Sequence, residues 1–171
     1  MLKGSKIKLR AVEPSDATLI YLWENDVENW KFTNTDAPLS MFEIYQLIEE
    51  QRVVRESGQL RLMILDVNSD DIFGAVDLYN IDFKNGFGTV GILIAEKQNR
   101  SKGFALESLN LLADYSKNHL NLFNLNCGIQ SSNVPSQRLF EKAGYHNIGI
   151  RKNWFLVEGN REDEYLYQLE L

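Results

Sequence analysis

The stretch RSKGFALESL begins at Arg100 and places Ser101, Lys102, Gly103 and Ala105 directly before an apolar helical pattern. The first turn of a helix carries backbone N–H groups without intrahelical partners and a partial positive charge. Small residues let an anion approach those groups, and the basic side chains add formal charge, which is typical of a phosphate-binding turn. The pattern is equally compatible with a basic loop that ends in a helix cap. It matches neither the dinucleotide-binding nor the P-loop glycine pattern.

The elements that position this turn follow from hydrophobic periodicity. Strands are predicted at 6–12, 59–67, 72–81, 87–95, 122–129, 145–157 and 161–171, and helices at 13–25, 39–58, 105–120 and 133–144. Asn85-Gly86 predicts a hairpin between two of the strands. The sequence therefore predicts a mixed α/β (α+β) fold of about seven strands and four helices. Its sheet is mostly antiparallel, with one β-α-β crossover that passes through the turn.

Composition limits the class of protein. The 171 residues carry a net charge of −6, which argues against nucleic acid as a partner and favours cationic ligands. His119, Cys127 and His146 lack the spacing of metal ligands, so no metal is expected. The single cysteine, the lack of a signal-peptide pattern and the lack of a long apolar run predict a cytoplasmic protein without a membrane span. We expect a single domain over residues 1–171.

Three segments together resemble the GNAT superfamily of N-acetyltransferases, which use acetyl-CoA. They are TVGILIA, the turn that begins at Arg100, and NVPSQRLFEKAGY, which begins at Asn133. The family's pyrophosphate loop reads Q/R-x-x-G-x-G/A, which Arg100, Gly103 and Ala105 match, with Ser101 where a glycine is usual. The likeness covers nearly the whole chain and is closest to the branch that acetylates ribosomal-protein N-termini and polyamines. It implies that the fourth and fifth predicted strands splay apart.

By this resemblance acetyl-CoA is the acetyl donor. Its implied contacts are Ile92, Leu93 and Ile94 along the pantetheine arm, Arg100, Ser101, Lys102, Gly103, Phe104 and Ala105 around the pyrophosphate, and Asn133, Ser136 and Phe140 at the following helix. The backbone N–H of Leu93 is implied as the donor that stabilises the oxyanion. Asn133 is equally well suited to be an ordinary helix N-cap.

The proton-transfer residues depart from the family's pattern. Phe140 stands where many relatives have a tyrosine that acts as the acid, and Thr89 stands where the family often has a glutamate. Asp77 is the candidate base, because it is an acidic residue inside an apolar strand. A solvated, outward-facing aspartate is the alternative, with water as the base. Tyr145, Tyr167 and water are the alternatives for the acid.

The acceptor site is expected near the end of the first predicted helix. Glu24, Glu28 and Trp30 lie there, and carboxylates beside aromatic rings suit a cation. A solvated charged surface is the alternative interpretation. In the family this region helps to form the wall of the acceptor site.

The sequence therefore predicts an acetyl-CoA-dependent N-acetyltransferase that acts by direct attack in a ternary complex. Its expected acceptor is a small cationic amine such as a polyamine. Two alternatives stay open, namely a protein N-terminal acetyltransferase of the ribosomal-protein type and a non-catalytic acyl-CoA-binding protein. Thr89 and Phe140 keep the second alternative open, because neither side chain transfers a proton. A homo-oligomer is compatible with the sequence.

Overall fold

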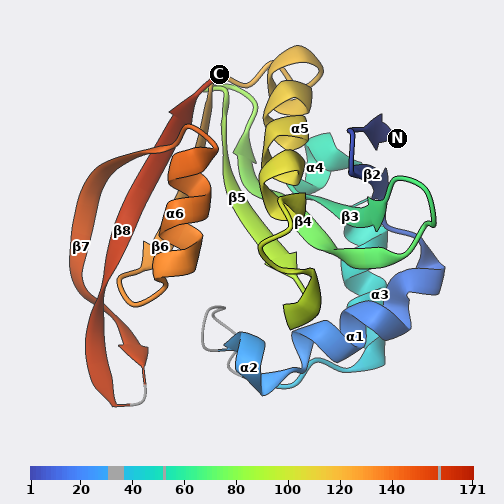
Figure 1. Cartoon of the computed structure of the whole chain (residues 1–171), viewed down its shortest axis with the longest axis horizontal. Helices are drawn as coiled ribbons and strands as arrows, with labels where there is room; N and C mark the ends of the chain where they lie inside the picture. The colour runs from blue at the N-terminus through green and yellow to red at the C-terminus, as the bar shows by residue number, and fades with distance from the viewer. Residues whose placement is uncertain (31–36, 52, 158) are drawn as a thin grey trace.

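A computed structural model describes residues 1–30, 37–51, 53–157 and 159–171. Its strands form one sheet in the order β1-β2-β3-β4-β5-β6-β8-β7 (Figure 1). They are β1 Leu2–Lys3, β2 Ile7–Ala11, β3 Leu60–Asp66, β4 Ile72–Asp82, β5 Phe87–Ile94, β6 Asn124–Gln130, β7 His146–Val157 and β8 Asn160–Glu170. Among these described strands only β5 and β6 pair in parallel. The predicted mixed fold with a mostly antiparallel sheet is confirmed, and the short β1 is an addition to it.

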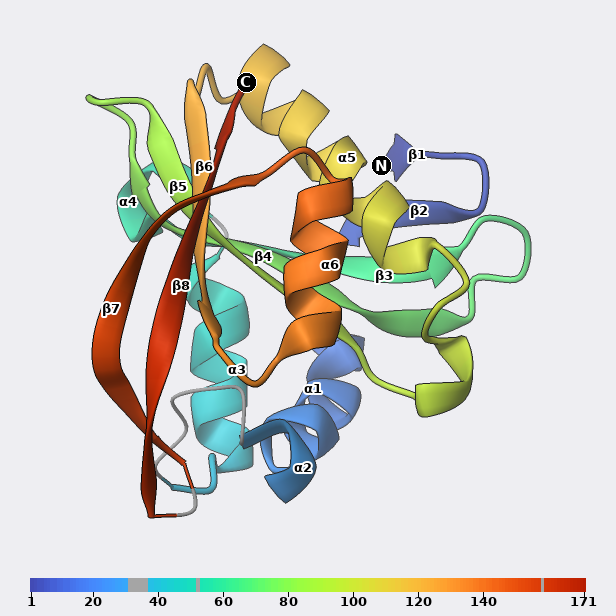
Figure 2. The same ribbon diagram turned by 60° about the vertical axis from the view of Figure 1, so that its left-hand side comes forward.

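Helices cover both faces of the sheet (Figure 2). The helices α5, Phe104–Asn118, and α6, Val134–Lys142, pack on one face, and α1, Ala17–Glu24, and α3, Met41–Glu50, pack on the other. Short turns of helix connect the elements: η1 Pro14–Asp16, α2 Val27–Trp30, α4 Val54–Ser57 and η2 Lys97–Asn99. No helix in the described part of the chain is both long and apolar enough to span a membrane.

The structure divides the helix that was predicted over 39–58. Ser40 begins α3 with a capping box, in which Glu43 N donates to Ser40 Oγ and Ser40 N donates to the Glu43 carboxylate. The helix stops before Gln51, whose side chain accepts a hydrogen bond of 2.7 Å from Arg61 N in β3. The separate turn α4 ends at Gly58, which has a φ of 65°. Position 52 lies outside the described residues, as does position 158 in the turn predicted between the last two strands.

The core has two parts, one on each face of the sheet. Along β4, Val76 and Leu78 point into the part beneath α5 and α6, whereas Ala75 packs in the part beneath α1 and α3. This alternation is the period of two that a strand imposes on its side chains. Because β4 is central, every side chain on it belongs to one of two chemically different environments.

The predicted hairpin between β4 and β5 is confirmed. Gly86 has a φ of 74°, in the left-handed region that glycine adopts without a steric penalty. The Asp82 carboxylate accepts hydrogen bonds of 2.9 Å from the backbone N–H groups of Lys84 and Asn85. The turn fixes the register of β4 against β5, in which Asp77 lies opposite Gly91.

The strands β5 and β6 separate soon after they begin. Their parallel pairing runs from Phe87–Asn124 to Thr89–Asn126 and then stops, although both strands continue. Thr89 Oγ1 donates to Asn126 Oδ1 at 3.1 Å, and Asn126 Nδ2 donates to Gly88 O at 3.0 Å, so side chains close the last rung. Beyond it the two strands diverge, as Figure 1 shows. The expected splay between these strands is confirmed.

Glu107 fastens the N-terminal turn to the start of α5. Its carboxylate accepts hydrogen bonds from Ser5 N, from Ser5 Oγ at 2.7 Å, from Lys6 N at 3.0 Å and from Ile7 N at 3.2 Å. Burial alone would raise the pKa of Glu107, but these hydrogen bonds outweigh burial and lower the pKa below its usual value. The ionised carboxylate therefore stabilises this corner of the fold.

We expect Glu107→Gln to lower the free energy of unfolding by about 1 kcal/mol at neutral pH, because hydrogen bonds to a charged group contribute about 1.5–3 kcal/mol when buried and less when partly exposed. Folding lowers the pKa of Glu107, so the stabilisation is present above its usual pKa of 4.5 and is lost as the pH falls through the folded pKa. Guanidinium unfolding from about pH 3 to pH 7 measures the difference. Asp114→Asn on the same helix is the exposed control, and a difference independent of pH would contradict this assignment.

Candidate active site

The turn before α5 has the geometry of an anion site. Gly103 is the N-cap of α5 with a φ of 88°, and within the described chain no side chain caps this helix. Ser101 also has a positive φ, of 62°. Arg100 Nε donates to Ile94 O at 3.0 Å and Nη2 donates to Ala95 O at 3.2 Å, and its expected contact with the pyrophosphate stays a prediction. Its guanidinium therefore holds the turn against the end of β5.

Two lysines provide the remaining positive charge at this turn. Lys102 Nζ donates to Asn99 Oδ1 at 3.2 Å, and Lys6 Nζ donates to Lys102 O at 3.1 Å. Lys6 Nζ also lies 3.3 Å from the point where a Cβ on Gly103 would be. The uncapped helix start, the absent Cβ and the nearby ammonium groups together fit a phosphate group. Lys6 was not among the expected residues, because it is far from the turn in sequence.

The open part of β5 leads away from this turn. Ile92, Leu93 and Ile94 follow the last residue paired with β6, and all three are half-buried, whereas Val90 is only 3% exposed. An ordinary strand at the centre of a covered sheet would be buried on both faces. The half-buried segment has the extended backbone and apolar character that an extended arm such as pantetheine requires.

The helix α6 begins just after β6, the strand that separates from β5. Asn133 is its N-cap and accepts a hydrogen bond of 3.3 Å from Ser136 N, so the capping interpretation of Asn133 is confirmed. Phe140 is 3% exposed and packs edge-on against Tyr145, with ring centroids 5.0 Å apart. The structure thus places Phe140 in the core beneath α6. Contacts of Asn133, Ser136 and Phe140 with the cofactor stay predictions.

Neither tyrosine is well placed to act as an acid. Tyr145 is 1% exposed, and its hydroxyl has no hydrogen-bond partner among the described residues. Burial raises its pKa, so this phenol releases a proton less readily. Tyr167 is 2% exposed and donates to the Glu141 carboxylate at 3.2 Å, and burial raises its pKa as well. The identity of the acid stays a prediction.

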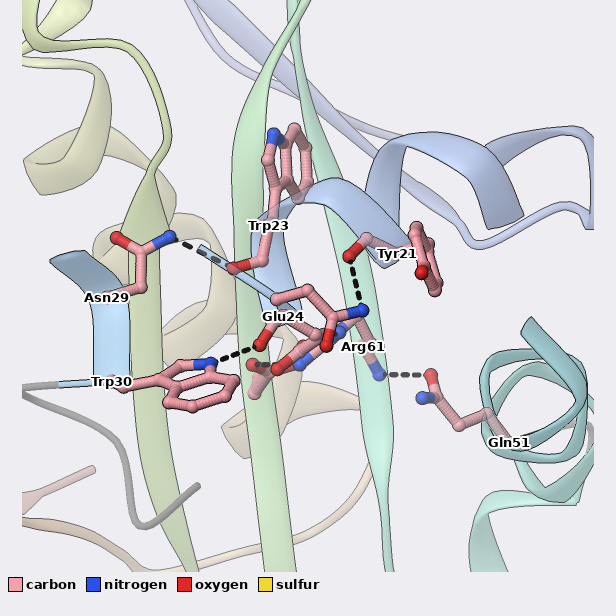
Figure 3. A network of polar contacts seen from close by, with 9 residues as sticks. Tyr21, Trp23, Glu24, Asn29, Trp30, Gln51 and Arg61 are labelled. Atoms are coloured by element: carbon pink, nitrogen blue, oxygen red, sulfur yellow. Dashed lines mark hydrogen bonds and ion pairs between the residues drawn. The ribbon is translucent and has the colours of Figure 1, made fainter. Parts of the chain in front are cut away.

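Arg61 joins two of the expected acidic residues into one network (Figure 3). Its Nε and Nη2 donate to the two carboxylate oxygens of Asp77, at 2.6 and 3.1 Å, and its Nη1 donates to Glu24 Oε1 at 2.6 Å. The side chains of Arg61, Glu24 and Asp77 are 20%, 21% and 27% exposed. Because β3 and β4 pair Arg61 with Asp77, the sheet register brings these residues together.

The same network reaches α2. Trp30 Nε1 donates to Glu24 O at 2.6 Å, and Asn29 Nδ2 donates to Trp23 O at 3.1 Å, as Figure 3 shows. The expected grouping of Glu24 with Trp30 is therefore present in the structure. Glu28 is exposed on α2, and its carboxylate makes no ion pair within the described part of the chain. Its role in acceptor binding stays a prediction.

The network lies directly beside the open part of β5. A Cβ on Gly91 would lie 3.8 Å from Asp77 Cβ and 3.9 Å from Asp77 Oδ2, so the Asp77 side chain lies over this glycine. Gly91 belongs to the stretch of β5 that has no partner in β6. Asp77 projects toward the face covered by α1 and α3, because the neighbouring Val76 and Leu78 point to the opposite face.

The guanidinium of Arg61 keeps its positive charge within the network. Burial alone would lower the pKa of Arg61, but Asp77 and Glu24 outweigh burial and raise it, so the guanidinium stays charged. Two carboxylates and one guanidinium leave one negative charge in excess. Sequence reasoning missed Arg61, although it is a charged residue in an apolar strand, which is the same signal that identified Asp77.

Comparisons with known proteins identify the family. The family model described as an acetyltransferase (GNAT) domain matches residues 6–146. A probable N-acetyltransferase of Bacillus subtilis (strain 168), YjcK, is 28% identical over 174 residues, with 95% of this chain and 93% of that protein covered.

Solved structures show the same fold. The spermidine N-acetyltransferase of Vibrio cholerae in complex with CoA and spermine has a TM-score of 0.88 at 23% identity, covering 98% of this chain and 96% of that chain. A dodecameric structure of the V. cholerae spermidine N-acetyltransferase in an intermediate state has a TM-score of 0.82 at 24% identity, covering 98% and 95%.

The family match covers most of the chain and agrees with the turn at Arg100 and with the splay of β5 from β6. The expected resemblance is confirmed. This chain therefore belongs to the GNAT family and is an N-acetyltransferase, an acyltransferase that takes its acetyl group from acetyl-CoA.

Proposed function

We propose that the enzyme acetylates a primary amine of a small cationic acceptor of the polyamine class. The observation that carries this proposal is the position of the Glu24–Arg61–Asp77 network beside the unpaired part of β5. Acetyl-CoA supplies an activated acetyl group as a thioester. Its pyrophosphate binds at the start of α5, and its pantetheine arm follows Ile92–Ile94 into the splay from the face that α5 and α6 cover.

The charge of the network supports a cationic acceptor. Its one excess negative charge is shared by Glu24 and Asp77, and Trp30 is held beside it. A partly desolvated carboxylate binds an ammonium group more strongly than an exposed one does, and an aromatic face adds a cation–π contribution. The net charge of −6 for the whole chain attracts the same kind of ligand. The V. cholerae enzyme of the same fold was solved with spermine.

We assign Asp77 an anchoring role in preference to the role of base. Both of its carboxylate oxygens accept hydrogen bonds from Arg61, so the side chain is held in one orientation and its lone pairs are already engaged. A primary alkylamine has a pKa of about 10.4, so the attacking amine must lose a proton before it becomes a nucleophile. Water accepts that proton, and a backbone N–H at Leu93 stabilises the oxyanion.

A panel of acceptors tests the substrate class. Free thiol release from acetyl-CoA is measured with spermidine, spermine, putrescine, an aminoglycoside and a basic N-terminal peptide. We expect turnover with one or more of the polyamines and little with the peptide. Turnover with the peptide alone would establish a protein N-terminal acetyltransferase instead. CoA binding without turnover on any of these amines would refute the polyamine class and place the acceptor outside this panel.

The role of Asp77 is tested by Asp77→Asn. We expect KM for the amine to rise about tenfold and kcat to change much less, because an anchor contributes mainly to binding, whereas loss of a general base typically lowers kcat by about 10²–10⁴-fold. The shape of the pH–rate profile should be unchanged. Asp16→Asn is the matched control, since Asp16 forms a bidentate pair with Arg10 in another part of the fold. A large fall in kcat with a lost pH limb would restore Asp77 as the base.

The donor site is tested by Gly103→Glu. We expect CoA affinity to fall by more than about tenfold with the fold intact, because the new carboxylate repels phosphate at the helix start. Gly103→Ala is the control, since it introduces the same strain at a φ of 88° without the charge. Isothermal titration with CoA and thermal unfolding measure the two effects. CoA affinities of both folded variants equal to that of the unmodified protein would refute a pyrophosphate at this turn.

A further inference from the structure

The strand β4 contains an irregularity beside the end of β5 and the start of α5, where the pantetheine arm and the pyrophosphate are proposed to bind. The pairing of β3 with β4 passes from Ile64–Gly74 directly to Leu65–Ile72, which leaves Phe73 as an extra residue. An extra residue of this kind is a β-bulge, which bends its strand and redirects the neighbouring backbone. Such bulges are frequent next to active sites. Phe73 and Gly74 are therefore the residues at which β4 departs from regular pairing.

Gly74 allows the backbone of β5 to come unusually close. A Cβ at this position would lie 1.9 Å from Leu93 O, 2.9 Å from Leu93 C and 3.1 Å from Ile94 Cα. All three are backbone atoms, so no rotation of a side chain could relieve the overlap. Glycine is therefore the only residue type that fits at position 74 without a shift of the Leu93 carbonyl.

The close contact lies on the face of the sheet that α5 and α6 cover. Gly74 precedes Val76 by two residues, and Val76 packs in the core beneath these helices. A Cβ on Gly74 would therefore point to that face, where the Leu93 oxygen already lies. Because Leu93 also pairs with Ala75 of β4, this contact fixes the path of the part of β5 that has no partner in β6.

Phe73 supports the other half of the donor site. Its ring stacks on Phe104, the first residue of α5, with centroids 4.5 Å apart and planes inclined by 8°. Its carbonyl accepts a hydrogen bond of 3.0 Å from Ala95 N, at the end of β5. The bulged residue thus contacts both ends of the segment that runs from β5 through the turn to the helix start.

We propose that the Phe73–Gly74 bulge is a positioning element for acetyl-CoA. Gly74 sets the path of the β5 backbone along which the pantetheine arm lies, and Phe73 holds the helix start that receives the pyrophosphate. Neither residue needs to touch the ligand, since each acts through its neighbour. The proposal rests on acetyl-CoA as the donor and is independent of the acceptor class.

The role of Gly74 is tested with Gly74→Ala, by measuring binding and not activity. Isothermal titration compares acetyl-CoA with 3′-phosphoadenosine 5′-diphosphate, the part of CoA that ends at the pyrophosphate. We expect acetyl-CoA to bind about tenfold more weakly or worse, because a misplacement of about 1 Å can be costly, and the nucleotide to bind as it does to the unmodified protein. A general structural defect would weaken both ligands alike. Gly149→Ala is the control, since its Cβ would meet only Leu166 Cδ1, at 3.9 Å.

The role of Phe73 is tested with Phe73→Leu. This variant also tests the proposal if Gly74→Ala fails to fold. Leucine retains apolar volume but loses the ring stack on Phe104. We expect both ligands to bind more weakly, because both use the helix start. Unchanged affinity for the nucleotide in this folded variant would overturn the role of Phe73. Equal loss of both ligands in Gly74→Ala, or no loss of either, would overturn the role of Gly74.

Discussion

The end of pairing between β5 and β6 is the constraint on which the active site depends. A parallel pair in a covered sheet normally satisfies its backbone groups along its whole length. Here the side chains of Thr89 and Asn126 close the last rung, and the strands then diverge. Beyond this rung β5 has no partner in β6. At this part of the sheet α5 and α6 cover one face, and the acidic network lies on the other.

The two sides are built from different kinds of interaction. The proposed donor side uses the helix start at Gly103, the close approach of Leu93 to Gly74 and the bulge at Phe73, which are features of the backbone and its packing. The proposed acceptor side uses charged side chains from separate elements, held in place by the guanidinium of Arg61. Half-burial is essential there, because fully solvated charges would bind an amine weakly.

Short sequence patterns correctly predicted the features that depend on only a few neighbouring residues. The turn from Arg100 to Ala105, the N-cap at Asn133 and the alternation around Asp77 each depend on a few neighbouring residues. The partner of Asp77 depends on the register of β3 against β4, which no short pattern encodes.

Contacts between distant segments explain the remaining differences. The predicted helix over 39–58 stops where Gln51 meets Arg61, and the guanidinium of Arg100 binds backbone carbonyls at the end of β5. The close approach of Leu93 to Gly74 depends on how two strands pack, so the role of that glycine was not visible from its neighbours in sequence.

This contact also bears on how the proposed sites could diversify. The Leu93 atoms that approach Gly74 belong to the backbone, so mutation at position 93 changes the side chain and leaves these atoms in place. The proposed donor half therefore tolerates extensive sequence drift as long as position 74 remains glycine. The proposed acceptor half consists of side chains from α1, β3 and β4, so single substitutions there change it while the donor half stays the same.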